Sequence, residues 1–190
     1  MAQTRRDLLA ALLATPLAGA ASGQTAALPL TPACDDGDAP TPVQTEGPYF
    51  TPNTPRKRDF AADSPGGDRV ALVGFALDPS CRPLAGALIE LWHCDAAGVY
   101  DSDGFRLRGH QFTDAQGRWR FDTIVPGLYP GRTRHFHLKA QPRGGRVLTT
   151  QLYFPGEPGN TRDRVFDDRL LLDLATLDGA RVARFDLVLA

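Results

Sequence analysis

The chain has 190 residues and a formal net charge of −1 at pH 7, with 21 Lys and Arg residues against 22 Asp and Glu residues. This length allows one domain with a substantial hydrophobic core, but not two large domains. Because acidic and basic residues nearly balance and are mixed along the chain, there is no electrostatic case for binding nucleic acid or an anionic membrane surface.

The N-terminus has the features of an export signal. Arg5 and Arg6 precede Asp-Leu-Leu and an apolar run, and the small residues at 18–20 resemble a cleavage site. The paired arginines indicate twin-arginine export, with a Sec signal or an uncleaved anchor as alternatives. The apolar run is short for a membrane span. We therefore expect a signal peptide at residues 1–23, a periplasmic or extracellular protein, and no stable membrane insertion.

Three cysteines, Cys34, Cys81 and Cys94, have no Cys-x-x-Cys spacing, which argues against a zinc ribbon or a thioredoxin-like site. One disulfide is expected after export to an oxidising compartment. Cys81 and Cys94 are expected at opposite ends of one strand, too far apart to bond. Cys34 is therefore the expected partner of one of them, and the sequence leaves open which.

The order of apolar segments and turns predicts the fold. Residues 24–68, rich in Pro, Thr, Asp and Gly, are expected to form an extended arm in which the aromatic segment 44–50 docks onto a domain at residues 69–190. Short strands without alternating helices favour a mainly β protein, an antiparallel β-sandwich with long loops and little helix. The one helical candidate is Thr161–Leu172. Strands are expected at 70–78, 87–95, 118–124, 134–140, 147–154 and 181–190.

A His-x-His pair, His135 and His137, lies in one of these expected strands. Side chains two residues apart in a strand share a face and lie about 7 Å apart along the chain, so both imidazoles could bind one metal ion. The pair alone is a weak signal, because a solvated strand face gives the same pattern. The other histidines, His93 and His110, are expected to be structural or exposed, although a four-histidine site is the competing arrangement.

Two tyrosines strengthen the case for a metal. Tyr129 lies six residues before His135 in a Pro/Gly turn, and Tyr100 follows an expected strand. Phenolate is a hard anionic donor, so two tyrosines with two histidines favour Fe(III) over Zn(II) or Cu(I). The ferric charge would lower the pKa of a bound tyrosine from its ordinary value of about 10. Either tyrosine alone would more often be a packing residue.

Several separate motifs resemble the intradiol ring-cleavage dioxygenases, the family that includes the protocatechuate 3,4- and catechol 1,2-dioxygenases. The resemblance spans roughly residues 41–155. It implies a non-haem Fe(III) enzyme that cleaves a catechol-type ring between its two hydroxyl-bearing carbons with O2, giving a cis,cis-muconate-type diacid. The motifs are TEGPYF, GALIELWHCDAAGVYD, LRGHQFTDAQGRWRFDTIVPGLYPGRTRHFHLKA and LTTQLYF.

The resemblance also implies the ligands of the iron. Tyr100 and His135 would be equatorial ligands, Tyr129 and His137 would be axial ligands, and a hydroxide or water would complete the set. The matching positions follow one another in the order that the family shows. A cupin-type site, which also uses His-x-His, is disfavoured because residues 139–145 provide no carboxylate.

Further roles follow from the same resemblance. Arg132 matches the arginine that lies over the substrate ring, and Gln151 matches the active-site glutamine. Tyr129, displaced from the metal as a basic phenolate, would take a proton from the catechol. Pro48 and Tyr49 would line the substrate entrance.

One departure and one alternative remain. The family's Arg-Pro-Ala-His-Ile-His reads Arg-Thr-Arg-His-Phe-His here, and Arg134 is expected to face away from the iron with no assigned role. The main alternative function is an exported, transthyretin-like β-sandwich binding module without catalysis. Retention of the four ligand positions with Arg132 and Gln151 argues against it. The expected partners are a catechol-type molecule and O2, with a homo-oligomer also compatible with the sequence.

Overall fold

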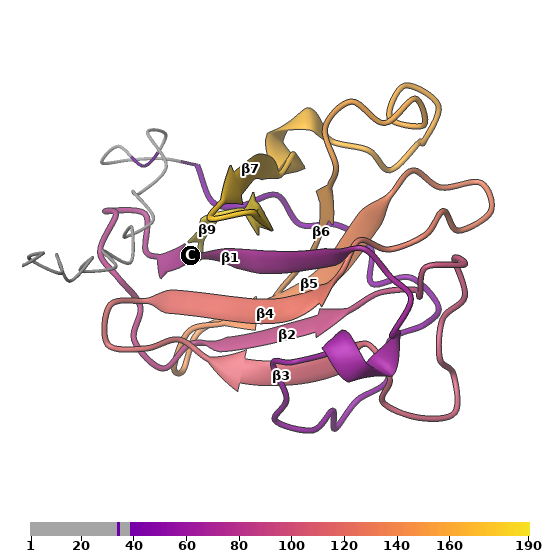
Figure 1. The fold of residues 1–190 in the computed structure, drawn as a ribbon. Helices are drawn as coiled ribbons and strands as arrows, with labels where there is room; N and C mark the ends of the chain where they lie inside the picture. Colours follow the sequence, from indigo (N-terminus) through magenta and orange to yellow (C-terminus); the bar gives the residue numbers. More distant parts are fainter. Residues whose placement is uncertain (1–33, 35–38) are drawn as a thin grey trace, which may run out of the picture.

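The structure is a computed structural model that describes residue 34 and residues 39–190, and the predicted signal peptide at 1–23 lies outside the described residues. Two β-sheets packed on one another form the molecule (Figure 1). No α-helix occurs in the described residues, which contain only two short 3-10 helices, η1 (Ala61–Asp63) and η2 (Asp168–Leu170). Within that part of the chain, no helix is long and apolar enough to cross a membrane.

Nine strands make up the two sheets. One sheet has five strands, in the order β4-β1-β8-β7, with β9 pairing with β1; the other has four, in the order β3-β2-β5-β6. The strands are β1 (Arg69–Leu77), β2 (Leu88–Trp92), β3 (Arg108–Phe112), β4 (Arg118–Ile124), β5 (His135–Gln141), β6 (Leu148–Tyr153), β7 (Asp173–Leu177), β8 (Ala180–Arg184) and β9 (Leu187–Val188).

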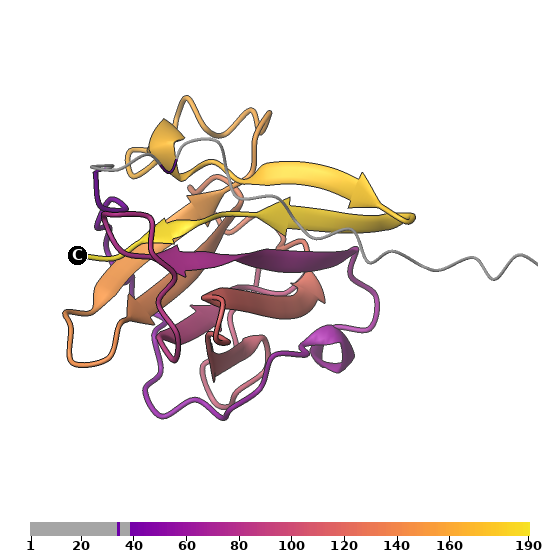
Figure 2. The same cartoon turned by 90° about the vertical axis from the view of Figure 1, so that its left-hand side faces the viewer.

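The predicted β-sandwich is confirmed, but its pairing is not antiparallel throughout. The four-stranded sheet is antiparallel, whereas β1 pairs in parallel with both β8 and β9. Figure 2 shows the β7–β8 hairpin in yellow alongside β1. Parallel neighbours need a long connection between them, and here strands β2 to β7 lie between β1 and β8 in the chain.

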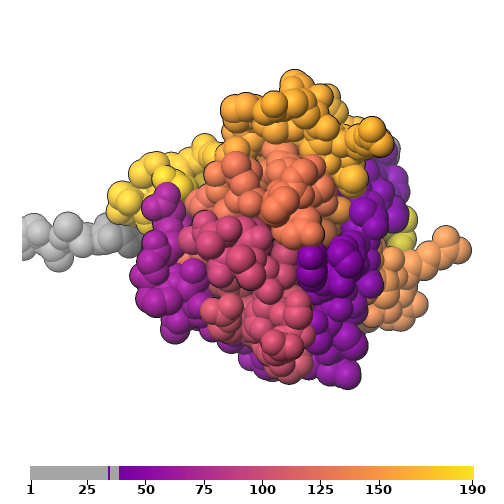
Figure 3. Space-filling model, turned by 90° about the vertical axis from the view of Figure 1, so that its right-hand side faces the viewer, coloured from indigo at the N-terminus to yellow at the C-terminus, as the bar shows by residue number. Residues whose placement is uncertain are grey.

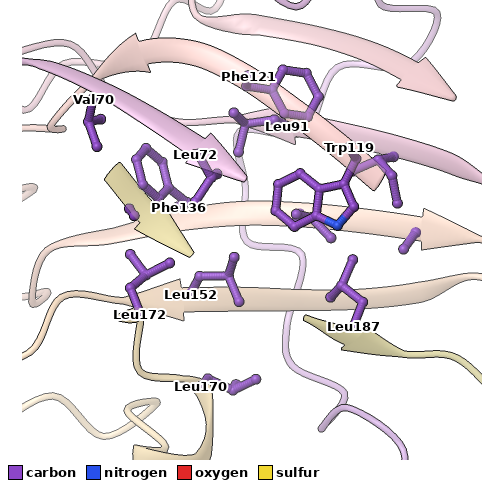
Figure 4. Close-up of a cluster of buried hydrophobic side chains, with 14 of the residues drawn as sticks. Val70, Leu72, Leu91, Trp119, Phe121, Phe136, Leu152, Leu170, Leu172 and Leu187 are labelled. Atoms are coloured by element: carbon purple, nitrogen blue, oxygen red, sulfur yellow. The ribbon is translucent and has the colours of Figure 1, made fainter. Parts of the chain in front are cut away.

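Apolar side chains from the inner faces of both sheets fill the space between them (Figure 4). Phe136 and Leu152 from the four-stranded sheet meet Leu72, Trp119 and Phe121 from the five-stranded sheet. All five are buried, and removal of this apolar surface from water stabilises the sandwich. Because successive strand residues face opposite sides, burying Phe136 in this core turns its two histidine neighbours outward.

The predicted helix at Thr161–Leu172 is wrong. This segment forms turns and η2. Asp163 Oδ1 accepts the Val165 N–H at 2.9 Å, and Asp167 Oδ1 accepts the Arg169 N–H at 3.0 Å. Such side-chain bonds satisfy backbone donors locally and compete with a helix.

The arm that precedes β1 is hydrogen-bonded to both sheets. The Thr41 N–H donates to the Val188 carbonyl of β9 at 3.0 Å, and the Gln44 N–H donates to the Thr149 carbonyl of β6 at 2.8 Å. Upstream, a disulfide joins Cys34 to the turn after β1. That disulfide settles the open pairing as Cys34–Cys81, with a Cα–Cα distance of 5.7 Å, and leaves Cys94 as a buried free thiol.

Candidate metal centre

The His-x-His pair lies on the outer face of the four-stranded sheet, away from the core. Three segments cover this face: the arm, the loop that follows β2 and the segment that follows β4. Figure 3 shows them side by side in indigo, pink and orange, and tyrosines from all three pack together. Under this cover His135 and His137 are each only 3% exposed. The two histidines therefore share a buried site that is separated from the core by the sheet.

Three donor atoms converge in this site. The Nε2 atoms of His135 and His137 lie 3.1 Å apart, and the Tyr100 hydroxyl lies 3.2 Å from Nε2 of His135. Nδ1 of His135 lies 2.6 Å from the Thr133 carbonyl. Because a carbonyl only accepts, this contact places the ring proton on Nδ1 and leaves the Nε2 lone pair free to bind a metal.

Burial sets the protonation of these groups. It lowers the pKa of His135 to about 4 and that of His137 well below the ordinary value. Burial raises the pKa of Tyr100 far above its ordinary value, so this phenol ionises only when a cation binds beside it. Neutral imidazoles and a cation-dependent phenolate are the states that metal ligation requires.

The donor set fits a hard metal ion. Two ligands at right angles, each bound at about 2.0–2.1 Å, lie about 3 Å apart, close to the separations observed here. No group of three His, Cys, Asp or Glu side chains among the described residues could hold a metal. The Tyr100 hydroxyl is the further donor that lies against these imidazoles, and a phenolate with two imidazoles suits a ferric ion.

Tyr129 lies at the edge of this cluster. Its ring centroid is 5.7 Å from that of Tyr100, and its hydroxyl lies 2.9 Å from the Tyr49 hydroxyl. The Tyr49 ring stacks on Tyr100, with centroids 4.5 Å apart and an interplanar angle of 9°. Tyr49, predicted to line the entrance, is thus packed within the tyrosine cluster, while the preceding Pro48 is exposed.

Comparison with known proteins agrees with this geometry. A family model described as "Dioxygenase" matches residues 45–189. The chain belongs to the intradiol ring-cleavage dioxygenase family. The protocatechuate 3,4-dioxygenase beta chain of Burkholderia cepacia is 35% identical over 155 residues, which cover 66% of each chain. The chain spans about half to two thirds of the length of the curated relatives it matches.

Solved dioxygenase structures share the fold. The dioxygenase domain of a dioxygenase carbohydrate-binding protein fusion from Streptomyces sp. SirexAA-E is 50% identical, with a TM-score of 0.76, covering 80% of this chain and 98% of that one. The 3-chlorocatechol 1,2-dioxygenase of Rhodococcus opacus 1CP is 27% identical, with a TM-score of 0.70, covering 79% and 72%. Both similarities include the sandwich that carries the candidate site.

In this intradiol dioxygenase chain, Arg132 and Gln151 lie next to each other. Arg132 Nη2 donates to Gln151 Oε1 at 2.6 Å, and Gln151 Nε2 donates to the Thr45 carbonyl at 3.0 Å. Gln151 also pairs with His137 across β5 and β6. Arg132 and Gln151, two of the three predicted catalytic residues, are thus joined to each other, to the arm and to the histidine strand.

Asp163 holds Arg132 from the other side, with Nε to Oδ2 at 2.8 Å. Burial alone would raise the pKa of Asp163. The N–H groups of Val165 and Thr133 and the Arg132 guanidinium together hold that pKa below its ordinary value. Sequence reasoning missed Asp163, because its loop lies 31 residues from Arg132 and no spacing rule links them.

Arg134 faces away from the site, as predicted, and its role can now be described. Its Nε lies 2.7 Å from Glu157 Oε1, and its guanidinium also donates to the Pro126 carbonyl. The side chain therefore links the segment after β4 to the loop after β6.

The remaining histidines lie apart from the donor cluster. His93 is buried, with Nε2 2.7 Å from Thr123 Oγ1 and Nδ1 2.7 Å from the Cys94 carbonyl. His110, in β3, lies 3.3 Å from Thr54 Oγ1 through Nδ1. Both rings have local partners, so a four-histidine site is not formed.

Proposed function

We propose that this protein is a non-haem Fe(III) dioxygenase that cleaves a catechol-type ring between its two hydroxyl-bearing carbons with O2, giving a cis,cis-muconate-type diacid. The main support is the convergence of the Nε2 atoms of His135 and His137 with the Tyr100 hydroxyl. Relatives named as catechol, chlorocatechol and hydroxyquinol 1,2-dioxygenases support the substrate class. A non-catalytic binding module has no need of such a buried donor cluster.

Tyr100, Tyr129, His135 and His137 would hold the ferric ion. When bound, the ion would act as a Lewis acid and redox centre that makes a catecholate reactive toward O2. The protein part of the site supplies neutral imidazoles from β5 and a phenol from each of the two covering loops. Burial of these donors excludes water and strengthens electrostatic interactions within the site.

Tyr129 is the proposed proton acceptor for a substrate hydroxyl. Its hydroxyl lies at the edge of the donor cluster and contacts Tyr49 at 2.9 Å. In its phenolate form the Tyr129 oxygen can accept a hydrogen bond from Tyr49, which holds that oxygen in place until it takes the substrate proton and becomes a neutral hydroxyl. A general base within hydrogen-bonding reach of its proton is the geometric requirement for this role.

Arg132 would stabilise negative charge that develops on the substrate ring. Its guanidinium is held between Asp163 and Gln151, so little reorganisation is needed when the charge appears. Gln151 also donates to the Thr45 carbonyl, so the position of Arg132 is fixed relative to the arm.

Export by a twin-arginine-type signal to the periplasm or the exterior is part of this proposal. It is supported by the order of charged, apolar and small residues in 1–23 and by the Cys34–Cys81 pairing, because disulfides persist in oxidising compartments. Replacing both Arg5 and Arg6 by lysine should retain the protein in the cytoplasm. Undiminished export of that variant would argue against the twin-arginine route.

The function can be tested with purified, iron-loaded protein. Ferric tyrosinate should give a visible charge-transfer absorption that changes when catechol is added, and O2 consumption should match formation of a ring-opened diacid. The variant His135→Ala/His137→Ala should lose the absorption and the bound iron. A colourless wild-type protein that retains zinc or no metal after iron loading, and takes up no O2 with any catechol, would overturn the proposal.

A further inference from the structure

A buried arginine lies beside the metal centre, in a position that the proposed chemistry does not use. Arg108, in β3, is 1% exposed. It pairs with Trp92 in β2, and Trp92 pairs with His137 in β5, so the three residues form one row across the sheet on the face that carries the site. The Trp92 and His137 rings stack, with centroids 5.1 Å apart.

The Arg108 guanidinium joins two segments that cover the site. Its Nη1 donates to the Tyr49 carbonyl in the arm, and its Nε donates to the Asp101 carbonyl at 3.0 Å, with Nη2 donating to the same oxygen. Asp101 directly follows Tyr100. A planar guanidinium with five donors in fixed directions can hold two carbonyls at once, which a lysine ammonium on a flexible stem does less well.

These carbonyls belong to the two chain segments whose rings build the tyrosine cluster. The Tyr49 ring stacks on Tyr100, and the Tyr49 hydroxyl contacts that of Tyr129. Between residues 47–50 and 95–107, the described residues show no direct main-chain hydrogen bond. The polar connection between the two backbones therefore runs through Arg108.

Stability alone is a poor account of this side chain. No carboxylate of the described residues lies within ion-pairing distance of Arg108, and burying a charge against neutral carbonyls carries a desolvation penalty. Apolar side chains can pack two segments together without that desolvation penalty. A buried guanidinium that donates to two specific carbonyls additionally fixes the position of one carbonyl relative to the other.

We propose that Arg108 is a positioning residue of the active site, which sets the arm that carries Tyr49 against the loop that carries Tyr100 and, through the Tyr49 hydroxyl, sets the hydroxyl of Tyr129. The expected effect of Arg108 on turnover rests on the proposed function. Its expected effect on the position of the arm does not. Small displacements of reacting groups have large effects on rate, on the order of a hundredfold per ångström.

Two variants test it: Arg108→Lys, which keeps the charge and loses the fork, and Arg108→Gln. In the iron-loaded enzyme, kcat on catechol should fall roughly tenfold to a hundredfold, with a smaller change in KM. In the metal-free protein, amide hydrogen exchange should accelerate in a peptide covering residues 47–53. It should stay unchanged at 41–46, because Thr41 and Gln44 are bonded to the sheets.

The matched control is Arg184→Lys, a buried arginine in β8 of the other sheet. This variant should lower the melting temperature without changing kcat or exchange at 47–53. The proposal is overturned if Arg108→Lys keeps wild-type kcat and exchange, if both quantities change as much in Arg184→Lys, or if neither Arg108 variant folds. If the wild-type protein turns over no catechol, the proposed function fails, and exchange in the metal-free variants still decides the role of Arg108.

Discussion

Gly47 of the arm lies directly against the ring of His137. A Cβ placed on Gly47 would be 3.2 Å from Cε1 of His137, and the glycine has a φ of +72°. Glycine adopts this backbone conformation without strain, and a Cβ here would lie closer to the ring than an ordinary van der Waals contact. The arm therefore limits where the second histidine of the candidate metal centre can lie.

Substitution Gly47→Ala should weaken iron binding. The added methyl group would press on His137, and the left-handed backbone would add about 1 kcal/mol of strain. We expect a lower iron affinity in a metal titration, together with a modest loss of stability.

Gly144→Ala is the control for strain alone, because Gly144 has a φ of +68° and open space where the methyl would lie. It should lose similar stability and bind iron normally. Equal iron affinity in the two variants would contradict a steric role for Gly47.

Removal of Asp163 should disturb catalysis through Arg132. In Asp163→Ala, the partly buried guanidinium loses its counter-charge, and the Thr133 N–H loses its acceptor. We expect a loss of about 3 kcal/mol in the free energy of unfolding and at least a tenfold fall in kcat/KM.

Glu157→Ala breaks an ion pair of similar length, to Arg134, which faces away from the site. That variant should keep kcat/KM within a factor of two or so, since surface-proximal pairs contribute about 1 kcal/mol or less. If both variants lost activity equally, the effect of Asp163 would be general destabilisation.

His93 should make the metal-free protein sensitive to acid. Burial lowers its pKa to about 4, whereas an exposed histidine titrates near about 6.5. Between these values the unfolded chain binds a proton that the folded chain excludes, so stability is complete above about pH 6.5 and falls as the pH drops toward about 4. The contribution is about 3 kcal/mol at most.

His93→Gln removes this titration. Urea denaturation at several pH values should therefore show a flatter pH dependence for the variant than for the wild type. Parallel curves for the two proteins would show that His93 does not titrate in this window.

The disulfide should stabilise the fold without affecting the geometry of the candidate metal centre. It closes a sequence separation of 47 residues, which in the chain-entropy model is worth about 4 kcal/mol. The variant Cys34→Ser/Cys81→Ser should melt at a lower temperature yet bind iron normally, because residues 41–46 are bonded independently to both sheets. Dithiothreitol should lower the melting temperature of the wild type but not that of the variant. Loss of iron binding in the variant would contradict the prediction that the disulfide acts on stability alone.

Strand positions in the fold were predictable where alternation was clear. The expected strands around Phe136 and Leu152 became β5 and β6 because their apolar residues fill the core. β3 and β7 were missed, and the last predicted strand is divided into β8 and β9. All five residues of β7 are exposed, and its two leucines, Leu174 and Leu177, are three residues apart, so the segment lacks the two-residue alternation of a strand with one buried face. The Asp178-Gly179 turn, with φ values of 49° and 78°, was an available hairpin signal.

Candidate site residues were predictable only as far as local motifs and family resemblance reach. His135 and His137 share a face because of strand periodicity, which sequence alone supplies. Gly47, Arg108 and Asp163 had no such signal. Their contacts join segments far apart in the chain, and such contacts depend on the tertiary fold rather than on local spacing.

The route of the arm has a consequence for the order in which the protein becomes functional. Thr41 is bonded to Val188 in the last strand, 147 positions away, and the same arm brings Gly47 and Tyr49 to the site a few residues later. Contacts between distant parts of a chain form late in folding, because closing a long loop is entropically unfavourable. In a nascent chain the His-x-His segment is therefore synthesised before the last strand, to which the arm is bonded. Acquisition of the closed site would mark the end of folding.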